Sequence, residues 1–234
     1  MSHFDRSTHH AVPSLLLMVI AIILVVPVMA HETAMEHLNE GIDALTDVAS
    51  TQSGSALRNA ISESRCIAVV PKLTEAAFIA GGKHGHGLVT CKLSRDQWSA
   101  PSFFSINGAS VGAQVGVQHK TMVILAMNDD GKQMFLQDEL NLLGAATEAA
   151  AEASAGDHSS SRTWTDKPIL TFEVSKGLFA GATLKDTTIK RDDEVMNALY
   201  GKNVRTQDIL GGTVPVPESA KSFLEKVQKL NNPN

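Results

Sequence analysis

One serine of this 234-residue sequence lies in a pattern that is typical of hydrolase nucleophiles. Residues 108–112 read Gly-Ala-Ser-Val-Gly, which fits G-x-S-x-G and makes Ser110 the candidate nucleophile of a serine-dependent hydrolase. Such a nucleophile elbow needs a strand that ends at the serine and a helix that begins directly after it. Small or polar residues instead alternate with apolar ones through Gln114 to Val117, which predicts that Ser110 lies inside a strand. A hydrolase with an unidentified base is therefore the alternative, and a non-catalytic strand residue is the main interpretation.

A second chemical pattern is the histidine pair His84 and His86. Two imidazoles separated by one residue share a face of a strand and could bind a metal ion there. Neither a carboxylate nor a third histidine is close to them in the sequence, and glycines at positions 82, 85 and 87 favour a turn. We therefore interpret residues 82–87 as a hairpin tip, and we expect neither a metal nor another cofactor.

The segment from residue 58 to residue 95 is basic within an acidic chain. Six positive charges and only two negative ones, Glu63 and Glu75, give it a local charge of +4, while the whole chain has a formal net charge of −5. A Lys or Arg near an anionic membrane contributes about 1 kcal/mol and is screened by salt. Any contact with anionic phospholipid or a membrane surface is therefore predicted for Arg58, Arg65, Lys72, Lys83, Lys92 and Arg95.

The overall composition places the chain among ordinary globular proteins. Hydrophobic residues make up 43% and charged residues 19% of the sequence, which is enough to form a core. The net charge of −5 and the aromatic content of 5% disfavour nucleic-acid binding, which needs a basic face or aromatic platforms for the bases. We expect no nucleic-acid partner.

Residues 1–30 have the pattern of a signal peptide. Arg6 precedes an uninterrupted apolar run over residues 15–26, and Val28 and Ala30 provide the residues that a signal peptidase reads. We expect cleavage after Ala30 and a mature chain in the periplasm or outside the cell, in solution or peripheral on a membrane. The alternative is an uncleaved anchor, although the run is shorter than the ~20 residues of a spanning helix.

The elements that follow predict an α+β domain over residues 31–234. Thr33 and Glu36 form a capping box at the start of an amphipathic helix with an acidic polar face, and apolar residues at helical spacing end the chain. Strands are predicted at residues 66–70 (ended by Pro71), 76–82, 87–93, 103–117, 122–127, 169–176, 177–184 and 187–191, with a turn at 128–131 and an Ala-rich helical segment at 145–155.

Glycine spacing in the central strand predicts the shape of the sheet. Gly108, Gly112 and Gly116 recur at every fourth residue, and glycines inside strands favour sharp curvature or a close approach of another backbone. We therefore expect a curved, partly barrel-like antiparallel sheet, flanked by N- and C-terminal helices.

The two cysteines of the chain, Cys66 and Cys91, fall on two predicted strands about one hairpin apart. An exported chain reaches an oxidising compartment, where cysteines on neighbouring strands can satisfy the geometry of a bridge. We predict a Cys66–Cys91 disulfide that closes a loop of 24 intervening residues, with two buried thiols as the alternative.

Several motifs, in one order along the chain, resemble the SYLF domain over about residues 56–230. They are residues 66–71 (Cys-Ile-Ala-Val-Val-Pro), 77–82 (Ala-Phe-Ile-Ala-Gly-Gly), 98–101 (Trp-Ser-Ala-Pro), the Gly, Ser and Gln repeat at 108–118, residues 175–181 (Ser-Lys-Gly-Leu-Phe-Ala-Gly) and Leu199-Tyr200-Gly201. The resemblance implies a lipid-binding module, because SYLF domains of eukaryotic actin-regulating proteins bind phosphoinositides beside an SH3 or similar domain. Bacterial members are mostly exported envelope proteins, and the family implies no enzymatic activity.

Two features differ from the SYLF pattern. Residues 153–157 read Ala-Ser-Ala-Gly-Asp where many relatives have Gly-Pro-Val-Gly-Arg, and the N-terminal helix is acidic instead of basic. The membrane-inserting role of that helix in eukaryotic members is therefore not carried over. We expect an exported, non-catalytic envelope protein with a SYLF-like lipid-binding module, and an envelope protein-interaction scaffold is the alternative.

Overall fold

A computed structural model describes residues 13–51, 54–77, 80–111, 116–142, 150–152, 167–176 and 187–232. Its helices are α1 (Pro13–Ala49), α2 (Gly54–Glu63), α3 (Asp129–Phe135), α4 (Asp193–Tyr200), α5 (Thr206–Leu210) and α6 (Lys221–Asn231), with a 3-10 helix at Glu218–Ala220. Its strands are β1 (Cys66–Ala77), β2 (Ala80–Ser94), β3 (Gln97–Trp98), β4 (Ser102–Val111), β5 (Gly116–Ala126), β6 (Glu139–Leu142), β7 (Ala150–Glu152), β8 (Ile169–Lys176) and β9 (Thr187–Arg191).

The described strands form one sheet in the order β6-β9-β4-β2-β1-β5-β8-β7, and β3 pairs with β2 beside this path. Neighbouring strands are antiparallel except β7 and β8, which run parallel. The predicted α+β class, with an antiparallel sheet flanked by helices, is confirmed. Among the described strands the sheet stays open, because β6 and β7 end the order at opposite edges.

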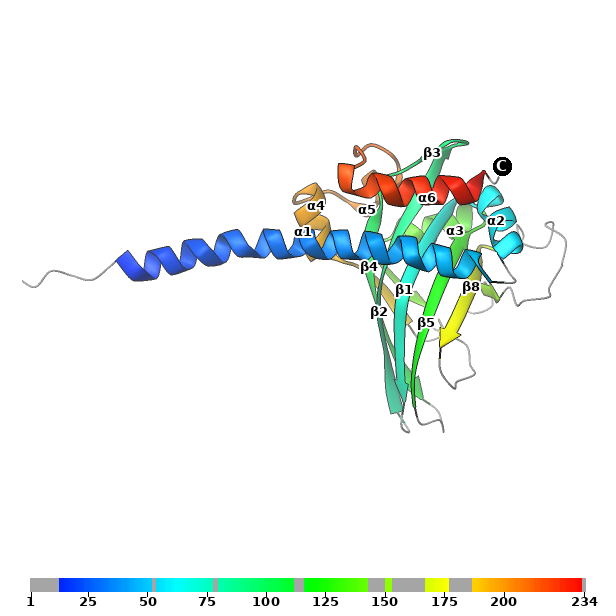
Figure 1. The fold of residues 1–234 in the computed structure, drawn as a ribbon, viewed down its shortest axis with the longest axis horizontal. Helices are drawn as coiled ribbons and strands as arrows, with labels where there is room; N and C mark the ends of the chain where they lie inside the picture. Colours follow the sequence, from blue (N-terminus) through cyan, green and yellow to red (C-terminus); the bar gives the residue numbers. More distant parts are fainter. Residues whose placement is uncertain are drawn as a thin grey trace, which may run out of the picture.

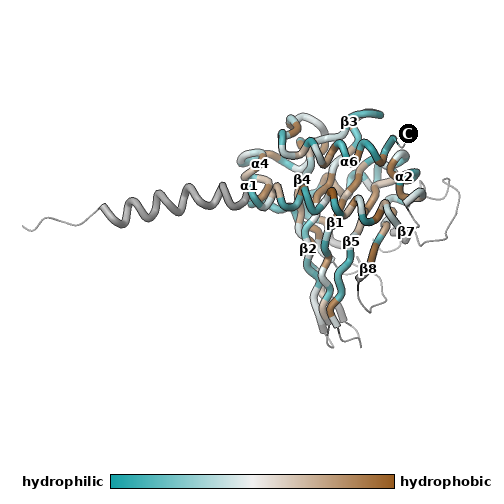
Figure 2. Tube along the Cα trace, viewed as in Figure 1, coloured by the Kyte–Doolittle hydropathy of each residue, from teal (hydrophilic) through white to brown (hydrophobic). Residues whose placement is uncertain are grey.

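Both faces of the sheet carry apolar residues, because the buried parts of the strands are almost continuously hydrophobic. In β1 the side chains of Ile67 and Val69 face one way, toward a core that includes residues of α1, α2, α4 and α6. Cys66, Ala68 and Val70 face the other way, toward Phe135 of α3 and Leu210 of α5. Figure 2 shows the hydrophobic residues concentrated where helices cross the strands.

The far ends of β1, β2 and β5 extend beyond the layer of helices (Figure 1). These ends are largely hydrophilic (Figure 2), and Val117 near the start of β5 is 62% exposed. Three charged residues of this part, Glu75, Lys83 and Lys120, are nevertheless buried. The far half of the sheet therefore buries charged side chains beside apolar ones such as Leu73.

Pro71 does not end the first strand, contrary to the prediction. β1 continues to Ala77, and its register with both neighbouring strands shifts between Val69 and Leu73. A proline lacks the N–H group that a strand needs, and a bulge accommodates this loss without ending the strand. The Pro71 carbonyl is used instead, since it accepts a hydrogen bond from Thr121 Oγ1 at 2.9 Å.

Residues 82–87, predicted as a hairpin tip, lie inside β2. The pairing of β1 with β2 continues past these residues, up to Ala77 and Gly81. Gly87 shows why a glycine is needed within the strand: a Cβ there would lie 2.4 Å from Phe104 Cζ and 2.7 Å from the Val69 carbonyl oxygen. Gly87 is therefore required by the close approach of the neighbouring strands. In the sequence alone, a glycine with this role looks the same as a glycine in a turn.

Three further predictions differ from the structure. The first described helix begins at Pro13, a residue type common in a first helical turn, so Thr33 lies inside α1 of the intact chain. Residues 128–131 begin α3, whose N-cap Asn128 accepts a hydrogen bond from the Gly131 N–H at 3.0 Å. Residues 150–152 of the predicted Ala-rich helix form β7, because they pair with β8.

Other predictions are confirmed, are divided between two strands or lie outside the described residues. The strands at 169–176 and 187–191 and the C-terminal helix correspond to β8, β9 and α6, and the strand at 122–127 corresponds to the second half of β5. The predicted strand at 103–117 is instead divided between β4, which ends at Val111, and β5, which begins at Gly116, and the predicted strand at 76–82 is divided between β1 and β2. The predicted strand at 177–184, the departure at residues 153–157 and most of the Ala-rich segment fall outside the described residues.

Candidate functional site

Ser110 lies within a strand, where a nucleophile elbow cannot form. It pairs with Gly81 of β2, and β4 ends one residue later at Val111. Because Val111, the residue directly after Ser110, is still part of β4, no helix begins at the serine in the described backbone. The G-x-S-x-G pattern therefore reflects small residues in a strand, and the geometry gives no support to the hydrolase alternative.

His84 and His86 do share a face of β2, and a third histidine joins them from α1. The ring centroids of His84 and His86 are 5.0 Å apart in an edge-on arrangement, and the ring of His37 stacks on His86 at 4.9 Å. Sequence analysis missed His37, because 47 residues separate it from His84 in the chain. The three rings form a row, and no group of three His, Cys, Asp or Glu residues in the described part of the chain is arranged to hold a metal ion.

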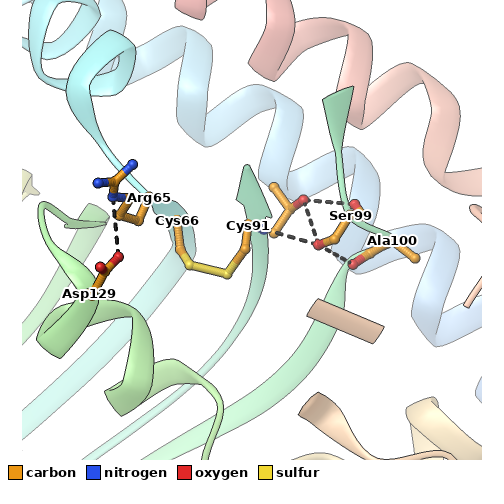
Figure 3. Close-up of a disulfide and its surroundings, with 7 residues drawn as sticks. Arg65, Cys66, Cys91, Ser99, Ala100 and Asp129 are labelled. Atoms are coloured by element: carbon orange, nitrogen blue, oxygen red, sulfur yellow. Dashed lines mark hydrogen bonds and ion pairs between the residues drawn. A yellow bond between two sulfur atoms is a disulfide. The ribbon is translucent and has the colours of Figure 1, made fainter. Parts of the chain in front are cut away.

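Cys66 and Cys91 lie directly opposite each other on β1 and β2 and form a disulfide in the structure (Figure 3). The Lys92 N–H donates to the Arg65 carbonyl at 2.7 Å, which makes the cysteines a non-hydrogen-bonded pair, the kind in which facing side chains come closest. Ser99 fixes the next segment, because its hydroxyl accepts from the Cys91 N–H at 3.0 Å and donates to the Ala100 carbonyl at 2.9 Å.

Two of the six basic residues predicted to contact lipid have structural partners instead. Lys83 is 6% exposed and its Nζ lies 3.3 Å from the Glu75 carboxylate, so its ammonium group is engaged inside the fold. Lys92 is half-buried, and its Nζ donates to the carbonyls of Ile61 and Ser62 at the end of α2. Burial, with a smaller effect of the Arg65 charge, lowers the pKa of Lys92. Side chains alternate between the two faces of a strand, but this alternation does not show which face other elements cover. The sequence therefore could not reveal that Lys83 and Lys92 are engaged inside the fold.

The other four basic residues separate into two places. Arg65 precedes β1 and Arg95 follows β2, so both lie at the disulfide end of the sheet, and Arg58 belongs to the adjoining helix α2. Arg65 forms one exposed ion pair with Asp129, at 3.4 Å (Figure 3). Lys72 instead lines a groove with Glu40, Asp43 and Asp47 of α1. The six residues therefore do not form a single surface.

A cluster of buried charges in the far half of the sheet was not predicted. The Glu75 carboxylate lies 3.3 Å from Lys83 Nζ and 3.6 Å from Lys120 Nζ, and Lys120 Nζ lies 3.8 Å from Glu173. Glu75, Lys83 and Lys120 come from three adjacent strands, β1, β2 and β5. Only the strand order reveals their proximity, because the sequence separates Glu75 from Lys120 by 45 residues.

Two of the motifs that carried the family resemblance have structural roles. Trp98 Nε1 donates to Gln228 Oε1 at 2.9 Å, which ties the short β3 to α6. The Tyr200 hydroxyl, at the end of α4, donates to the Pro101 carbonyl, and burial raises the pKa of this hydroxyl. Gly201 then ends α4 with a φ of 83°, a conformation that favours glycine.

The described part of the chain combines an open α+β sheet, with helices on both faces, and exposed arginines at one end of that sheet. Residues 107–230, more than half of the chain, match the family Ysc84, described as Las17-binding protein actin regulator. The chain belongs to this family, and the predicted SYLF resemblance is confirmed.

Curated relatives are larger than the matched region. Protein YSC84 of Saccharomyces cerevisiae is 29% identical over 175 residues, which cover 70% of this chain and 36% of the yeast protein. SH3 domain-containing YSC84-like protein 1 of Homo sapiens is 27% identical over 166 residues, 70% of this chain and 48% of the human protein. LAS seventeen-binding protein 3 of Saccharomyces cerevisiae is 29% identical over 156 residues, 62% of this chain and 32% of that protein.

The matched region thus spans between about a third and a half of these relatives' own length. The names of these relatives and the family description point to binding and regulation rather than to catalysis. Among the residues whose side chains the structure describes, no helix is both long and apolar enough to span a membrane.

Proposed function

We propose that this chain is a non-catalytic binding module that works in the cell envelope after export and that attaches to an anionic lipid surface. Family membership supports the binding role, since the family is described by a binding partner and not by a reaction. The apolar run at residues 15–26 supports export. The proposed contact is the disulfide end of the sheet.

The observation that carries the lipid proposal is the exposure of arginines at this end. Arg65 and Arg95 are exposed and Arg58 is half-buried, whereas Lys83 and Lys92 are engaged inside the fold. A guanidinium group donates hydrogen bonds in a planar fork that matches phosphate oxygens. The ion pair between Arg65 and Asp129 is exposed on both sides, so a lipid phosphate can replace Asp129 at little cost.

The strength of such attachment is modest and depends on salt. Each arginine near an anionic surface contributes about 1 kcal/mol, and the attraction falls off within a Debye length of about 8 Å at physiological salt. Three arginines would therefore strengthen binding by roughly 100-fold over a neutral surface. The attachment would be peripheral and reversible.

Co-sedimentation with phosphatidylcholine vesicles, with and without phosphatidylserine, tests this proposal. We expect binding that rises with phosphatidylserine and falls with added salt. The triple substitution Arg58→Gln, Arg65→Gln, Arg95→Gln should remove most of it. A control triple, Lys190→Gln, Lys202→Gln, Lys221→Gln, changes the net charge equally at exposed lysines away from the disulfide end and should retain most binding. Equal loss in both triples, or binding without phosphatidylserine, would contradict the assigned surface.

A protein partner is the second candidate function, because the family description and one relative's name both refer to binding of Las17. For this chain the corresponding role would be an interaction scaffold in the envelope. Native mass spectrometry after mild extraction separates the two functions: co-purified phospholipid favours lipid attachment, whereas a stoichiometric protein complex without lipid favours the scaffold.

A further inference from the structure

Three histidines connect helix α1 to the sheet. His37 of α1 stacks on His86 of β2 with a centroid distance of 4.9 Å and an interplanar angle of 24°, and His86 contacts His84 edge-on at 5.0 Å. The ring of Phe103 in β4 lies 6.2 Å from that of His37 on the same side of the sheet. An imidazole stack therefore forms part of the contact by which α1 covers the sheet.

The inner part of this stack is shielded from water. His37 is 8% exposed, and the Nδ1 atoms of both His37 and His86 are buried without a hydrogen-bond partner among the described residues. The outer ring, His84, is exposed, and its Nδ1 lies 2.9 Å from Asn107 Oδ1. Two stacked imidazoles with buried, unsatisfied ring nitrogens are compatible with neutral rings, whereas two charged rings at this distance would repel each other.

The charged groups around His37 come from three elements. His86 belongs to β2, Asp192 is the N-cap of α4, and Glu36 precedes His37 on α1 itself. Burial is the main effect that lowers the pKa of His37, followed by the charge of His86, while Asp192 and Glu36 act in the opposite direction. The Asp192 carboxylate is partly engaged, because it accepts a hydrogen bond from the Val195 N–H at 3.1 Å.

We propose that the His37–His86 stack is a pH-sensitive latch, which holds the part of α1 around His37 on the sheet when the His37 ring is neutral and releases it when that ring is protonated. This inference is independent of lipid attachment. Protonation would place a positive charge on the His37 ring, which is 8% exposed and stacked on a second imidazole. Release lets the rings separate and become hydrated, so the undocked helix binds protons more readily than the docked one.

The direction of the pH dependence follows from this difference. The pKa of docked His37 is lower than the ordinary value of 6.5. Its contribution to docking is therefore complete above about pH 6.5 and is lost as the pH falls through the lower value of the docked state. Release would uncover apolar residues that this part of α1 covers, with Leu38 on the helix and Phe103 on the sheet as the nearest large ones.

Hydrogen exchange measured by mass spectrometry on the chain as purified from the expressing cell tests the latch. Rates are corrected for the intrinsic effect of pH and compared between peptides covering residues 34–45 of α1 and residues 66–70 of β1. Between about pH 7.5 and about pH 5, we expect protection of the α1 peptide to fall by about tenfold or more relative to the β1 peptide. An unchanged ratio, or a parallel loss in both peptides, would overturn the proposal.

Variants separate protonation of the stack from a general effect of acid. His37→Phe keeps a planar ring that cannot be protonated and should hold the α1 peptide protected at both pH values. The matched control is His119→Phe, which replaces an exposed histidine bonded to Thr74 and should keep the wild-type response. If His37→Phe lowers the protection of the β1 peptide even near neutral pH, the variant is destabilised and His86→Gln takes its place. A smaller pH-dependent loss of α1 protection in His86→Gln than in the wild type supports the latch, and an equal loss refutes it.

Discussion

At the scale of single residues, Glu75 has the largest predicted effect on stability. Its carboxylate is 4% exposed and lies between the ammonium groups of Lys83 and Lys120, which are also buried. Glu75→Gln keeps the size of the side chain but removes the only charge that both lysines share in the described contacts. Breaking a buried ion pair in this way costs about 3–5 kcal/mol, so the urea midpoint should fall strongly.

The neighbouring Glu173 provides the control for this substitution. Its side chain is 27% exposed and lies 3.8 Å from Lys120 Nζ, at the rim of the same cluster. Because this carboxylate keeps part of its contact with water and its distance to Lys120 Nζ is long for an ion pair, Glu173→Gln should lower stability less than Glu75→Gln does. Equal urea midpoints for the two variants would show that other groups compensate the charges of Lys83 and Lys120 when Glu75 is neutral. The Glu75 carboxylate would then not determine the stability of this part of the sheet.

At the scale of elements, the contact of β2 with β1 and β4 depends on a strand position without a side chain. A Cβ at Gly87 would lie 2.4 Å from the Phe104 ring and 2.7 Å from the Val69 carbonyl oxygen, so Gly87→Ala forces two strands and a ring to move. Such overpacking costs about 1–3 kcal/mol, and we expect the melting temperature to fall by about 2–10 °C.

Another glycine of the same strand shows the opposite expectation. A Cβ at Gly82 would meet only the Gly108 carbonyl oxygen, at 3.8 Å, which is an ordinary contact. Gly82→Ala should therefore leave the melting temperature unchanged or raise it slightly, because alanine loses less backbone entropy on folding. If both substitutions lower it equally, loss of glycine flexibility and not steric contact limits this strand.

At the scale of the whole molecule, the compartment decides the covalent state of the chain. Export predicts a mature protein that starts at His31 and carries the Cys66–Cys91 bond, and intact mass reads both features at once, since the bond lowers the mass by two hydrogens. Removal of both cysteines should cost roughly 3 kcal/mol of stability on the chain-entropy model. Two reactive thiols in denaturant, or a full-length mass from the membrane fraction, would contradict this prediction.

Local sequence patterns were sufficient to predict elements whose conformation follows from the residue types within the element itself. Runs of strand-forming apolar residues predicted β8 and the second half of β5, helical spacing predicted α6, and the motif order identified the family. The same patterns failed at Pro71 and at residues 82–87, where proline and glycine were interpreted as breaks. Both residue types end strands in isolation, but a bulge or a close neighbour lets a strand continue through them.

By its own residues the sequence determined the α+β class, the family and the two cysteines that face each other across one hairpin. Only the tertiary structure decided that His37 stacks on His86, that Glu75 lies between two lysines, and that Lys83 is inside while Arg65 is outside. The physical reason is that alternation along a strand assigns a side chain to a face, whereas burial and charge pairing depend on which strands and helices become neighbours.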